Sequence, residues 1–517
     1  MIIGPALAAR LQEARREAIR QRTQGLDALG AEHFDVLVIG GGATGLGVAV
    51  DAVTRGLRTA IVEANDWAAG TSSRSTKLVH GGVRYLEQLD FGLVREALRE
   101  RGLLHRNAPH LVHPLPFIVP SFKWWEGPFY GAGLKLYDAL AGSLNLKPSR
   151  FVGREEVIAR IPNVHLDGLR GGVEYHDGQF DDARMAISLL RTAELRGAIA
   201  VRSMRVVSLV RESGRVSGAE ASCALTGRTV RIRARTVVNC TGIFADGVRA
   251  MESEIARPMI EPAQGVHVVL DRSFQPSDTA IMVPHTDDGR VLFVIPWHGH
   301  TLIGTTDIPR PVAEEDPQPT EEEIGFILHN AGRYLQRIPA RGDVLAAFAG
   351  MRPLVHEGGM DGTASKKVSR EHVVLVGDAG LVSVMGGKWT TYRKMAQDGL
   401  DRAIEIGGLA ARPCETEALR VHGAIDRADA AWPAEEWLQA YGSEASELRS
   451  LMARDADMAT PLDPRLPYTV AALWWGLRHE QALSTEDLLF RRVRAGLLHS
   501  GATRDIASAL EPVLAAS

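Results

Sequence analysis

The stretch HFDVLVIGGGATGLGVAVDAVTRGLRTAIVEA, residues 33–64, decides the fold of this chain. The apolar, β-branched run Phe34–Ile39 is typical of a buried parallel strand. A helix is predicted over Leu46–Thr54 and a second strand over Arg58–Val62. A strand, a helix and a strand in this order form the first βαβ unit of a Rossmann-like sheet, so the fold class is α/β.

The turn between the first strand and the helix carries glycines at G-x-G-x-x-G spacing, namely Gly40, Gly42 and Gly45. These glycines permit a tight turn and a close approach of the backbone to a pyrophosphate that faces the helix N-terminus. Glu63 ends the second strand, 18 residues beyond Gly45, where an acid binds a ribose hydroxyl. Together these features predict a dinucleotide site.

Two later strands indicate which dinucleotide is bound. Residues 234–246, ARTVVNCTGIFAD, are typical of a strand that ends in a small polar turn. Residues 371–380, EHVVLVGDAG, are typical of an apolar strand that ends at Gly377 and Asp378, and this aspartate is expected to reach a ribityl chain and pyrophosphate. A domain that binds only NAD needs no such strand this far downstream, so the predicted cofactor is FAD.

The wide spacing of these strands predicts a discontinuous FAD-binding domain with an antiparallel-sheet substrate domain inserted into it. RVLFVIPWHGHTLIGTTD (290–307) predicts two strands around a turn, and TEEEIGFILHNAGRYL (320–335) predicts a helix that starts with acids. DDARMAISLLRTAELRGA (181–198), capped by Asp181 or Asp182, predicts a helix of the FAD domain. From about Cys414 the pattern becomes helical, which predicts an all-α C-terminal domain. The predicted boundaries are 1–32 for an N-terminal helical extension, 33–110, 180–255 and 355–405 for the FAD domain, 111–179 and 256–354 for the substrate domain, and 406–517 for the C-terminal domain.

Composition excludes several classes of protein. The formal net charge of −4 over 517 residues makes nucleic acid a poor partner. The three cysteines lack CxxC spacing, which favours reduced thiols in an intracellular protein over a metal site or disulfides. The longest apolar runs are shorter than 18 residues, and the N-terminal region has arginines throughout, unlike a secretory signal. That region predicts a solvated amphipathic helix, with a docking or homodimer contact as the alternative.

Several motifs, in this order, resemble the respiratory-type FAD-dependent glycerol-3-phosphate dehydrogenases, and the resemblance extends from Phe34 to about Leu498. The motifs are TSSRSTKLVHGGVRYLE (71–87), GRVLFVIPW (289–297), IGTTD (303–307), AGMRPL (349–354), SREH (369–372), GGKWTTYRKMA (386–396) and RHEQALSTEDLLFRRVR (478–494). The resemblance implies a step of glycerol metabolism: oxidation of sn-glycerol 3-phosphate to dihydroxyacetone phosphate by hydride transfer to FAD N5, with electrons then passed to a membrane quinone. A glycerol-3-phosphate oxidase that uses O2 is the first alternative. An amine or amino-acid oxidase of the same fold is disfavoured, because it would need a carboxylate clamp and a neutral amine donor, and a non-catalytic FAD scaffold is also disfavoured.

The phosphate and the secondary alcohol of such a substrate need a cationic clamp. Arg84 is predicted to fork onto two phosphate oxygens, and Tyr85 to add a hydroxyl donor. Arg352 and Lys388 match positions at which the family holds substrate. Asp307 is predicted either to accept from a substrate hydroxyl or to hold its loop.

Proton removal from the alcohol needs a base. Histidine is the usual choice near neutral pH, so His267 is the predicted base, and His267→Asn is expected to abolish an ionisation near neutrality. Arg352 is expected to stabilise the developing alkoxide. The residues assigned to the flavin side, in addition to the glycines and acids above, are Thr71, Ser72, Lys77, His80, Gly81, Gly387 and Thr391.

The segment PFIVPSFKWWEGPFYGAGLKLYDALAG, residues 116–142, mixes tryptophan, tyrosine and phenylalanine with lysine. Such residues favour the headgroup region of a bilayer. The segment therefore predicts peripheral, monotopic attachment to a lipid surface on the cytoplasmic side of the cell membrane. The alternative is an aromatic loop buried against the C-terminal helices.

Overall fold

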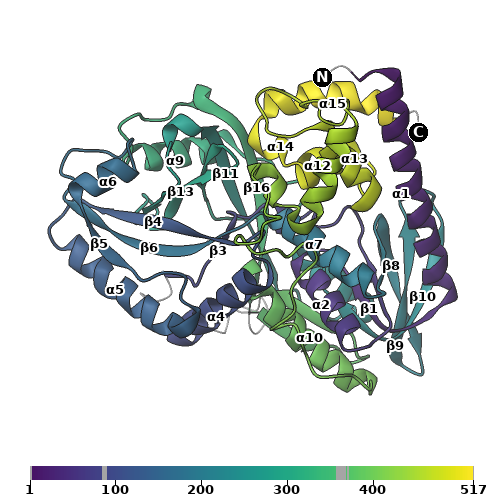
Figure 1. Cartoon of the computed structure of the whole chain (residues 1–517). Coiled ribbons are helices and arrows are strands. Elements are labelled where there is room, and N and C mark those ends of the chain that lie inside the picture. Colours follow the sequence, from purple (N-terminus) through teal and green to yellow (C-terminus); the bar gives the residue numbers. More distant parts are fainter. Residues whose placement is uncertain (1–2, 84–89, 357–367, 370–371, 516–517) are drawn as a thin grey trace.

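The computed structural model describes residues 3–83, 90–356, 368–369 and 372–515. Within these ranges the strands form two sheets, one of 8 and one of 11 strands. In Figure 1 the larger sheet lies to the left of the smaller one, and the C-terminal helices pack above the place where the two meet. The predicted fold class, a Rossmann-like sheet with a second, mainly antiparallel sheet and a helical C-terminal part, is confirmed.

The smaller sheet is built around the βαβ unit that the glycine-rich stretch predicts. Strand β1 (His33–Ile39) pairs in parallel with β2 (Thr59–Val62) on one side and β10 (Thr229–Asn239) on the other. Helix α2 (Ala43–Thr54) begins three residues earlier than predicted, because Gly42 is its N-cap and Thr44 and Gly45 are already helical. The other strands of this sheet are β7 (Ile199–Val201), β8 (Met204–Glu212), β9 (Arg215–Cys223), β18 (His372–Val376) and β19 (Val382–Gly386).

Alternate residues of β1 enter different hydrophobic clusters, as the two faces of a strand require. Val36 and Val38 join the cluster that contains α2, α7 (Asp182–Leu195) and α10 (Tyr392–Gly407). Leu37 and Ile39 join the cluster on the other face, which contains residues of β8 and β9. Both faces of the sheet are therefore covered, and its carboxyl edge is where polar turns emerge.

The larger sheet pairs its strands antiparallel, except that β12 (Ala280–Val283) runs parallel to β4 (His113–Ser121). The predicted hairpin is confirmed: β13 (Leu292–Trp297) and β14 (His300–Gly304) pair with Trp297 opposite His300. The predicted acid-started helix is α9 (Glu321–Gly332), with a capping box between Thr320 and Glu323. The remaining strands are β3 (Leu78–Val79), β5 (Arg150–Gly153), β6 (Gly171–Gln179), β11 (Ile260–Asp271), β15 (Ile308–Pro309), β16 (Val344–His356) and β17 (Val368–Ser369).

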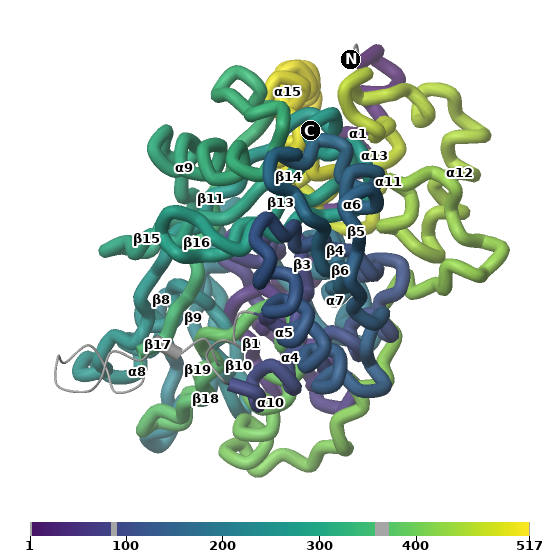
Figure 2. The backbone as a smooth tube through the Cα atoms, turned by 90° about the vertical axis from the view of Figure 1, so that its left-hand side faces the viewer, coloured from purple at the N-terminus to yellow at the C-terminus, as the bar shows by residue number. Residues whose placement is uncertain are grey.

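Four further helices are α4 (Phe91–Asn107), α5 (Glu126–Ala141), α6 (Arg154–Arg160) and α8 (Ala245–Glu252). Figures 1 and 2, which differ by a quarter turn, both place α4 and α5 next to each other beside β4 and β6. Helix α5 therefore covers the lower side of the larger sheet. This position contradicts the alternative that residues 116–142 form a loop buried against the C-terminal helices.

Helix α1 (Pro5–Ala31) is not a solvated appendage, so that expectation is wrong. It packs against α13 (Val470–His479), α15 (Ser500–Ala515), β7 and β10, and Figure 1 shows it along the whole right-hand side. A stripe of apolar residues at helical spacing is buried along its length: Leu7, Leu11, Ala14, Ala18, Leu26 and Leu29. The stripe is hard to see in the sequence because arginines lie between its members.

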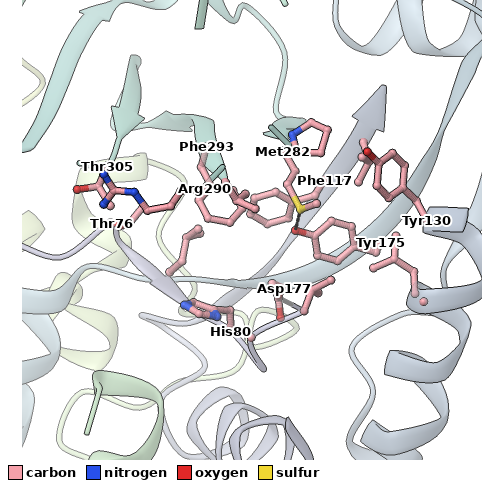
Figure 3. Close-up of a pocket in the computed structure, with 18 of the residues that line it drawn as sticks. Thr76, His80, Phe117, Tyr130, Tyr175, Asp177, Met282, Arg290, Phe293 and Thr305 are labelled. Atoms are coloured by element: carbon pink, nitrogen blue, oxygen red, sulfur yellow. Dashed lines mark hydrogen bonds between the residues drawn. The ribbon is translucent and has the colours of Figure 1, made fainter. Parts of the chain in front are cut away.

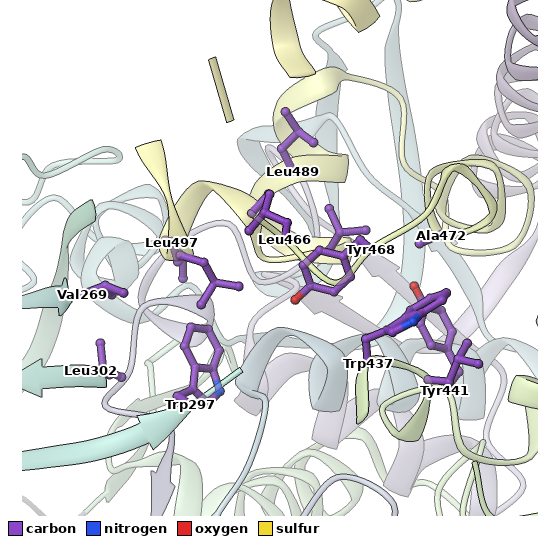
Figure 4. Packing of buried hydrophobic residues seen from close by; sticks show 14 of the residues in the cluster. Val269, Trp297, Leu302, Trp437, Tyr441, Leu466, Tyr468, Ala472, Leu489 and Leu497 are labelled. Atoms are coloured by element: carbon purple, nitrogen blue, oxygen red, sulfur yellow. The ribbon is translucent and has the colours of Figure 1, made fainter. Parts of the chain in front are cut away.

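The C-terminal helices begin later than predicted, at α11 (Glu436–Gln439), and residues 409–435 contain no helix. The other elements are α12 (Ala445–Arg454), a π-helix at Asp487–Arg492 and α14 (Ala495–Leu498). Their apolar faces share a core with the larger sheet, where Trp297 lies directly below Leu497 (Figure 4). Among the described helices, none has both the length and the apolar character needed to cross a bilayer.

Candidate active site

Two adjacent cavities mark the candidate site. The first is a cleft of about 440 Å³ at the carboxyl edge of the smaller sheet. The second is a cavity of about 850 Å³ in front of the larger sheet. Residues 71–80 and β16 form the wall that the two share, because Thr71 and Pro353 line the cleft whereas Thr76 and Arg352 line the cavity.

The glycine turn shapes the floor of the cleft. Gly40 has a φ of +106°, which an L side chain rarely adopts. A Cβ on Gly45 would lie 1.9 Å from the carbonyl oxygen of Gly40, so this position admits only glycine. The cleft is lined by Gly40 and Gly42, and α2 begins at once behind them. This arrangement leaves room for a pyrophosphate at the N-terminus of α2.

Glu63 lines the same cleft and is held by two backbone amides. Its Oε2 accepts from Gly41 N at 2.6 Å and its Oε1 accepts from Asn65 N at 2.8 Å. Burial nevertheless raises the pKa of this carboxyl above its ordinary value, against the opposing effect of the two amides. The carboxylate is thus fixed at the end of β2, where the sequence predicts a ribose contact.

Four more residues that the sequence singles out line the cleft: Thr71, Ser72, Gly387 and Lys388. Ser72 Oγ accepts from Ala43 N at 3.0 Å, and Trp389 Nε1 donates to Ser72 O at 2.8 Å. Lys388 therefore lines the cleft and not the larger cavity, although its motif predicts a contact with substrate. Thr391 is buried one turn further on, and its hydroxyl donates to Lys388 O at 3.2 Å.

Gly377 and Asp378 do not line the cleft, so their assignment to the cofactor is wrong. Strand β19 runs parallel to β10 and pairs with its last residues, so the turn before β19 lies away from the carboxyl edge. Glu252 accepts from the amides of Ala379 and Leu381 in that turn, both at 3.0 Å. The cleft is instead lined by Gly386, at the end of β19, and by Gly387 and Lys388, which follow it.

Lys77 lines neither cavity, so its assignment to the flavin side is also wrong. Its ammonium is fully buried and pairs with Asp182 at 2.6 Å. Burial lowers the pKa of Lys77 to about 8 despite that carboxylate. Gly81 also has a structural role, since a Cβ there would lie 2.4 Å from Leu98 and 2.6 Å from the hydroxyl of Tyr137.

The polar end of the larger cavity is formed around Arg352. Its Nη1 donates to Asp307 Oδ1 at 2.9 Å and its Nη2 donates to Thr305 Oγ1 at 3.3 Å. A Cβ on Gly265 would lie 2.5 Å from Nη2, so the glycine makes space for the guanidinium. Thr76, His80 and Arg290 complete this end, as the close-up in Figure 3 shows. Arg84 and Tyr85 lie outside the described residues, although Gly82 and Val83, just before them, line the cavity.

His267 lies behind the cavity wall, which contradicts its assignment as the direct proton acceptor. Its ring is 2% exposed and stacks on Phe348, and Thr76 Oγ1 lies between it and the cavity, 2.9 Å from Nε2. Burial, followed by the nearby cations Lys77 and Arg352, lowers the pKa of His267 well below its ordinary value. The ring is therefore neutral near pH 7 and cannot supply an ionisation there.

The structure adds residues that the sequence analysis missed. Asp177 lines the cavity, and its carboxylate accepts from Arg101 at 2.7 Å and from Tyr137 Oη at 2.9 Å. Tyr137 Oη in turn accepts from Gly81 N at 2.7 Å. Arg290 lies inside the family-like motif GRVLFVIPW, so that motif could have indicated it. Asp177 carries no such signal, because only the packing of α4, α5 and β6 brings it to the site.

The far end of the cavity is apolar. It is lined by aromatic and aliphatic side chains from the larger sheet and α5, namely Phe117, Val119, Phe129, Tyr130, Leu134, Leu136, Tyr175, Met282 and Phe293. Figure 3 labels Phe117, Tyr130, Tyr175, Met282 and Phe293 among them. Phe129 and Leu136 are also exposed on the outer surface of α5. The cavity therefore runs from the guanidinium of Arg352 to an apolar opening at this helix.

The cleft contains a glycine turn and a fixed carboxylate, and it shares a wall with a polar cavity. These features are those of a dinucleotide-dependent oxidoreductase. Comparison supports this class: residues 35–393 match the family described as FAD dependent oxidoreductase, and residues 382–517 match the C-terminal domain of alpha-glycerophosphate oxidase. FAD is therefore the cofactor, and the glycine turn at the N-terminus of α2 and Glu63 at the end of β2 fit its pyrophosphate and ribose.

More specifically, the chain belongs to the FAD-dependent glycerol-3-phosphate dehydrogenase family. It is 41% identical to the mitochondrial glycerol-3-phosphate dehydrogenase of Rattus norvegicus, over 95% of this chain and 71% of that protein. It is 42% identical to glycerol-3-phosphate dehydrogenase SDP6 of Arabidopsis thaliana, over 92% of this chain and 81% of that one. The crystal structure of glycerol-3-phosphate dehydrogenase from Bacillus halodurans, complexed with FAD, superposes with a TM-score of 0.78 at 28% identity, covering 97% of this chain and 93% of that chain.

Proposed function

We propose that this protein oxidises sn-glycerol 3-phosphate to dihydroxyacetone phosphate and passes the electrons to a membrane quinone. One observation supports this most directly: the guanidinium of Arg352 faces a cavity whose wall is the wall of the FAD cleft. When bound, FAD supplies the acceptor for the hydride that leaves C2 of the substrate. We also propose that residues 33–110, 180–255 and 355–405 bind FAD, that 111–179 and 256–354 bind substrate, and that 406–517 form the C-terminal domain.

The polar end of the cavity suits each part of this substrate. Arg352 can donate two hydrogen bonds to an oxygen that gains negative charge, and Asp307 holds the guanidinium in that orientation. We assign the phosphate to Arg84 and Tyr85, on the sequence argument alone. His80 lines the same end, and we propose its imidazole as the acceptor of the hydroxyl proton, in place of His267.

The apolar end of the cavity supports a quinone as the electron acceptor. A volume of about 850 Å³ is in the range of sites for drug-sized ligands and exceeds what a three-carbon phosphoester fills. The aromatic lining suits a planar ring, and the opening at α5 suits entry from a bilayer. An oxygen-using enzyme would need no such chamber, since O2 is a small molecule.

The outer face of α5 supports peripheral membrane attachment. Trp124 is 76% exposed, Phe129 is 55% exposed, and Trp125, Leu136 and Phe151 are also exposed nearby. The ammonium of Lys123 lies 5.7 Å from the ring of Trp125. Contiguous exposed aromatics next to a cation are typical of a surface that lies in the headgroup region of a bilayer. We propose that this face binds the cytoplasmic side of the cell membrane.

Two assays test these proposals. With sn-glycerol 3-phosphate, its enantiomer, glycerol and glycine as substrates, only the first should yield a keto product, and a quinone analogue should support faster turnover than oxygen. Equal rates with glycine would favour an amine oxidase, and faster turnover with oxygen would favour an oxidase. In sedimentation with anionic phospholipid vesicles, Trp124→Asp with Trp125→Asp should abolish binding, whereas Ile255→Asp, at an exposed apolar site outside α5, should not.

A further inference from the structure

The loop that separates the two cavities is held by one arginine of the C-terminal domain. Arg494 is 1% exposed and has a φ of +57°. Its Nη2 donates to Ser73 O and to Asp182 Oδ1, both at 2.8 Å. Ser73 directly follows Ser72, which lines the FAD cleft, and precedes Thr76, which lines the larger cavity. Arg494 itself lines neither cavity.

A second buried cation converges on the same two acceptors. Lys77 Nζ donates to Ser73 O at 2.9 Å and to Asp182 Oδ2 at 2.6 Å. Asp182 also accepts from the amide and the hydroxyl of Ser75, at 3.0 and 2.7 Å. This carboxylate at the N-terminus of α7 thus contacts two residues of the loop, Ser75 and Lys77, and the two cations balance its charge in a buried setting.

The charges around this cluster come from three parts of the fold. Asp181 Oδ1 lies 3.5 Å from Arg494 Nε. Asp181 Oδ2 lies 3.3 Å from Nε2 of His298, a residue on the turn of the β13–β14 hairpin. The ring of Trp297 lies 5.7 Å from the Arg494 guanidinium and 5.4 Å from Lys77 Nζ. The cluster therefore joins the C-terminal domain, the larger sheet and α7 at the base of loop 71–80.

We propose that Arg494 is a positioning residue for both sites: by fixing Ser73 O it sets the places of Ser72 at the cofactor and of Thr76 and His80 at the substrate. The C-terminal domain then acts on the chemistry through this contact, not only through its share of the core. The role of Arg494 at the substrate site rests on the proposed function. Its role at the cofactor site depends only on the position of Ser72 in the cleft.

The chain offers a matched control two residues away. Arg492 is equally buried and forks onto Asp66, with Nη1–Oδ2 at 2.8 Å and Nη2–Oδ1 at 2.9 Å. It also donates to Glu480 O, and within the described part of the chain its hydrogen bonds and ion pairs go to Asp66 and Glu480, not to residues 71–80. A lysine at either position keeps the charge and loses the planar fork. The two substitutions should therefore lower the Tm by similar amounts.

The experiment measures the rate of FAD release together with kcat and KM for sn-glycerol 3-phosphate. Arg494→Lys should speed FAD release about tenfold or more and lower kcat more than it raises KM, since loss of one charge-assisted hydrogen bond corresponds to roughly a tenfold change or more. Arg492→Lys should leave kcat and KM close to the wild-type values, and it should change FAD release less than Arg494→Lys does, because Arg202 and Arg491 still hold Asp66 beside the cleft. Equal effects of the two variants would overturn the inference.

A second variant keeps the test decisive if Arg494→Lys does not fold. Ser75→Ala removes the hydroxyl that donates to Asp182 and accepts from Lys77 N, and it should speed FAD release in the same direction by a smaller factor. Unchanged FAD release in Ser75→Ala would overturn the inference. If sn-glycerol 3-phosphate proves not to be a substrate, the proposed function fails, while FAD release still decides the role of Arg494.

Discussion

Replacement of Arg352 by lysine tests the site most sharply, because the structure shows what the two Nη atoms of the guanidinium contact. Arg352 presents two donors, to Asp307 and Thr305, and its side chain is 30% exposed. Lysine keeps the charge and offers a single point donor. One charge-assisted hydrogen bond contributes about 1.5–3 kcal/mol, and partial exposure favours the lower part of that range. The expected fall in kcat/KM is therefore roughly 10- to 30-fold.

The assay is initial-rate turnover of sn-glycerol 3-phosphate with a quinone analogue, at several substrate concentrations. Arg352→Ala removes both donors and the charge, so its kcat/KM should fall by about 150-fold or more. Arg333→Lys is the control, because Arg333 is exposed and pairs with Asp287 away from both cavities. If Arg352→Lys keeps wild-type kcat/KM, Arg352 serves only to hold Asp307, and its assignment to the substrate is wrong.

Three further predictions follow, two from the site and one from a buried histidine outside it. His80→Asn should remove a limb of the pH–rate profile near neutrality, whereas His267→Asn should leave that limb in place, because the pKa of His267 lies well below its ordinary value; the reverse pattern would restore His267 as the base. Gly45→Ala should yield protein without bound FAD, measured by absorbance, since its Cβ would lie 1.9 Å from Gly40 O; normal FAD content would contradict the cradle. Burial lowers the pKa of His110 to about 3, so the unfolded chain binds more protons below pH 6.5 and stability falls as the pH drops. At pH 5 this amounts to about 2 kcal/mol, and urea titrations of His110→Asn should show a shallower loss of stability between pH 7 and 5 than the wild type.

Local patterns predicted those parts of the fold that depend on neighbours in sequence. The βαβ unit at residues 33–64 follows from strand and helix periodicity and glycine spacing, and both are local. The β13–β14 hairpin is equally local. The burial of α1 could not be predicted in this way, because its apolar stripe is sparse and its partners, α13 and α15, lie more than 400 residues away.

The candidate site likewise combines residues that local motifs predict with residues that only long-range packing places. The motifs single out Arg352 and Thr71, and these residues line the cavity and the cleft. Lys77 and His267 have the right chemistry but are buried behind the wall, and only side-chain packing distinguishes a lining residue from its neighbour. The assignment of Asp378 to the cofactor is wrong because of the topology of the sheet. Asp378 lies in the turn between β18 and β19, whereas the cofactor edge is reached only at the far end of β19. The sequence does not show that two antiparallel strands, and not one, lead to that edge.

The most direct test of the central claim is anaerobic reduction of the bound flavin. One equivalent of sn-glycerol 3-phosphate should bleach the flavin absorbance of the purified protein and release dihydroxyacetone phosphate, while glycerol, lactate and glycine should leave the colour unchanged. Bleaching by glycine, or no bleaching by the phosphoester in FAD-loaded protein, would contradict the account.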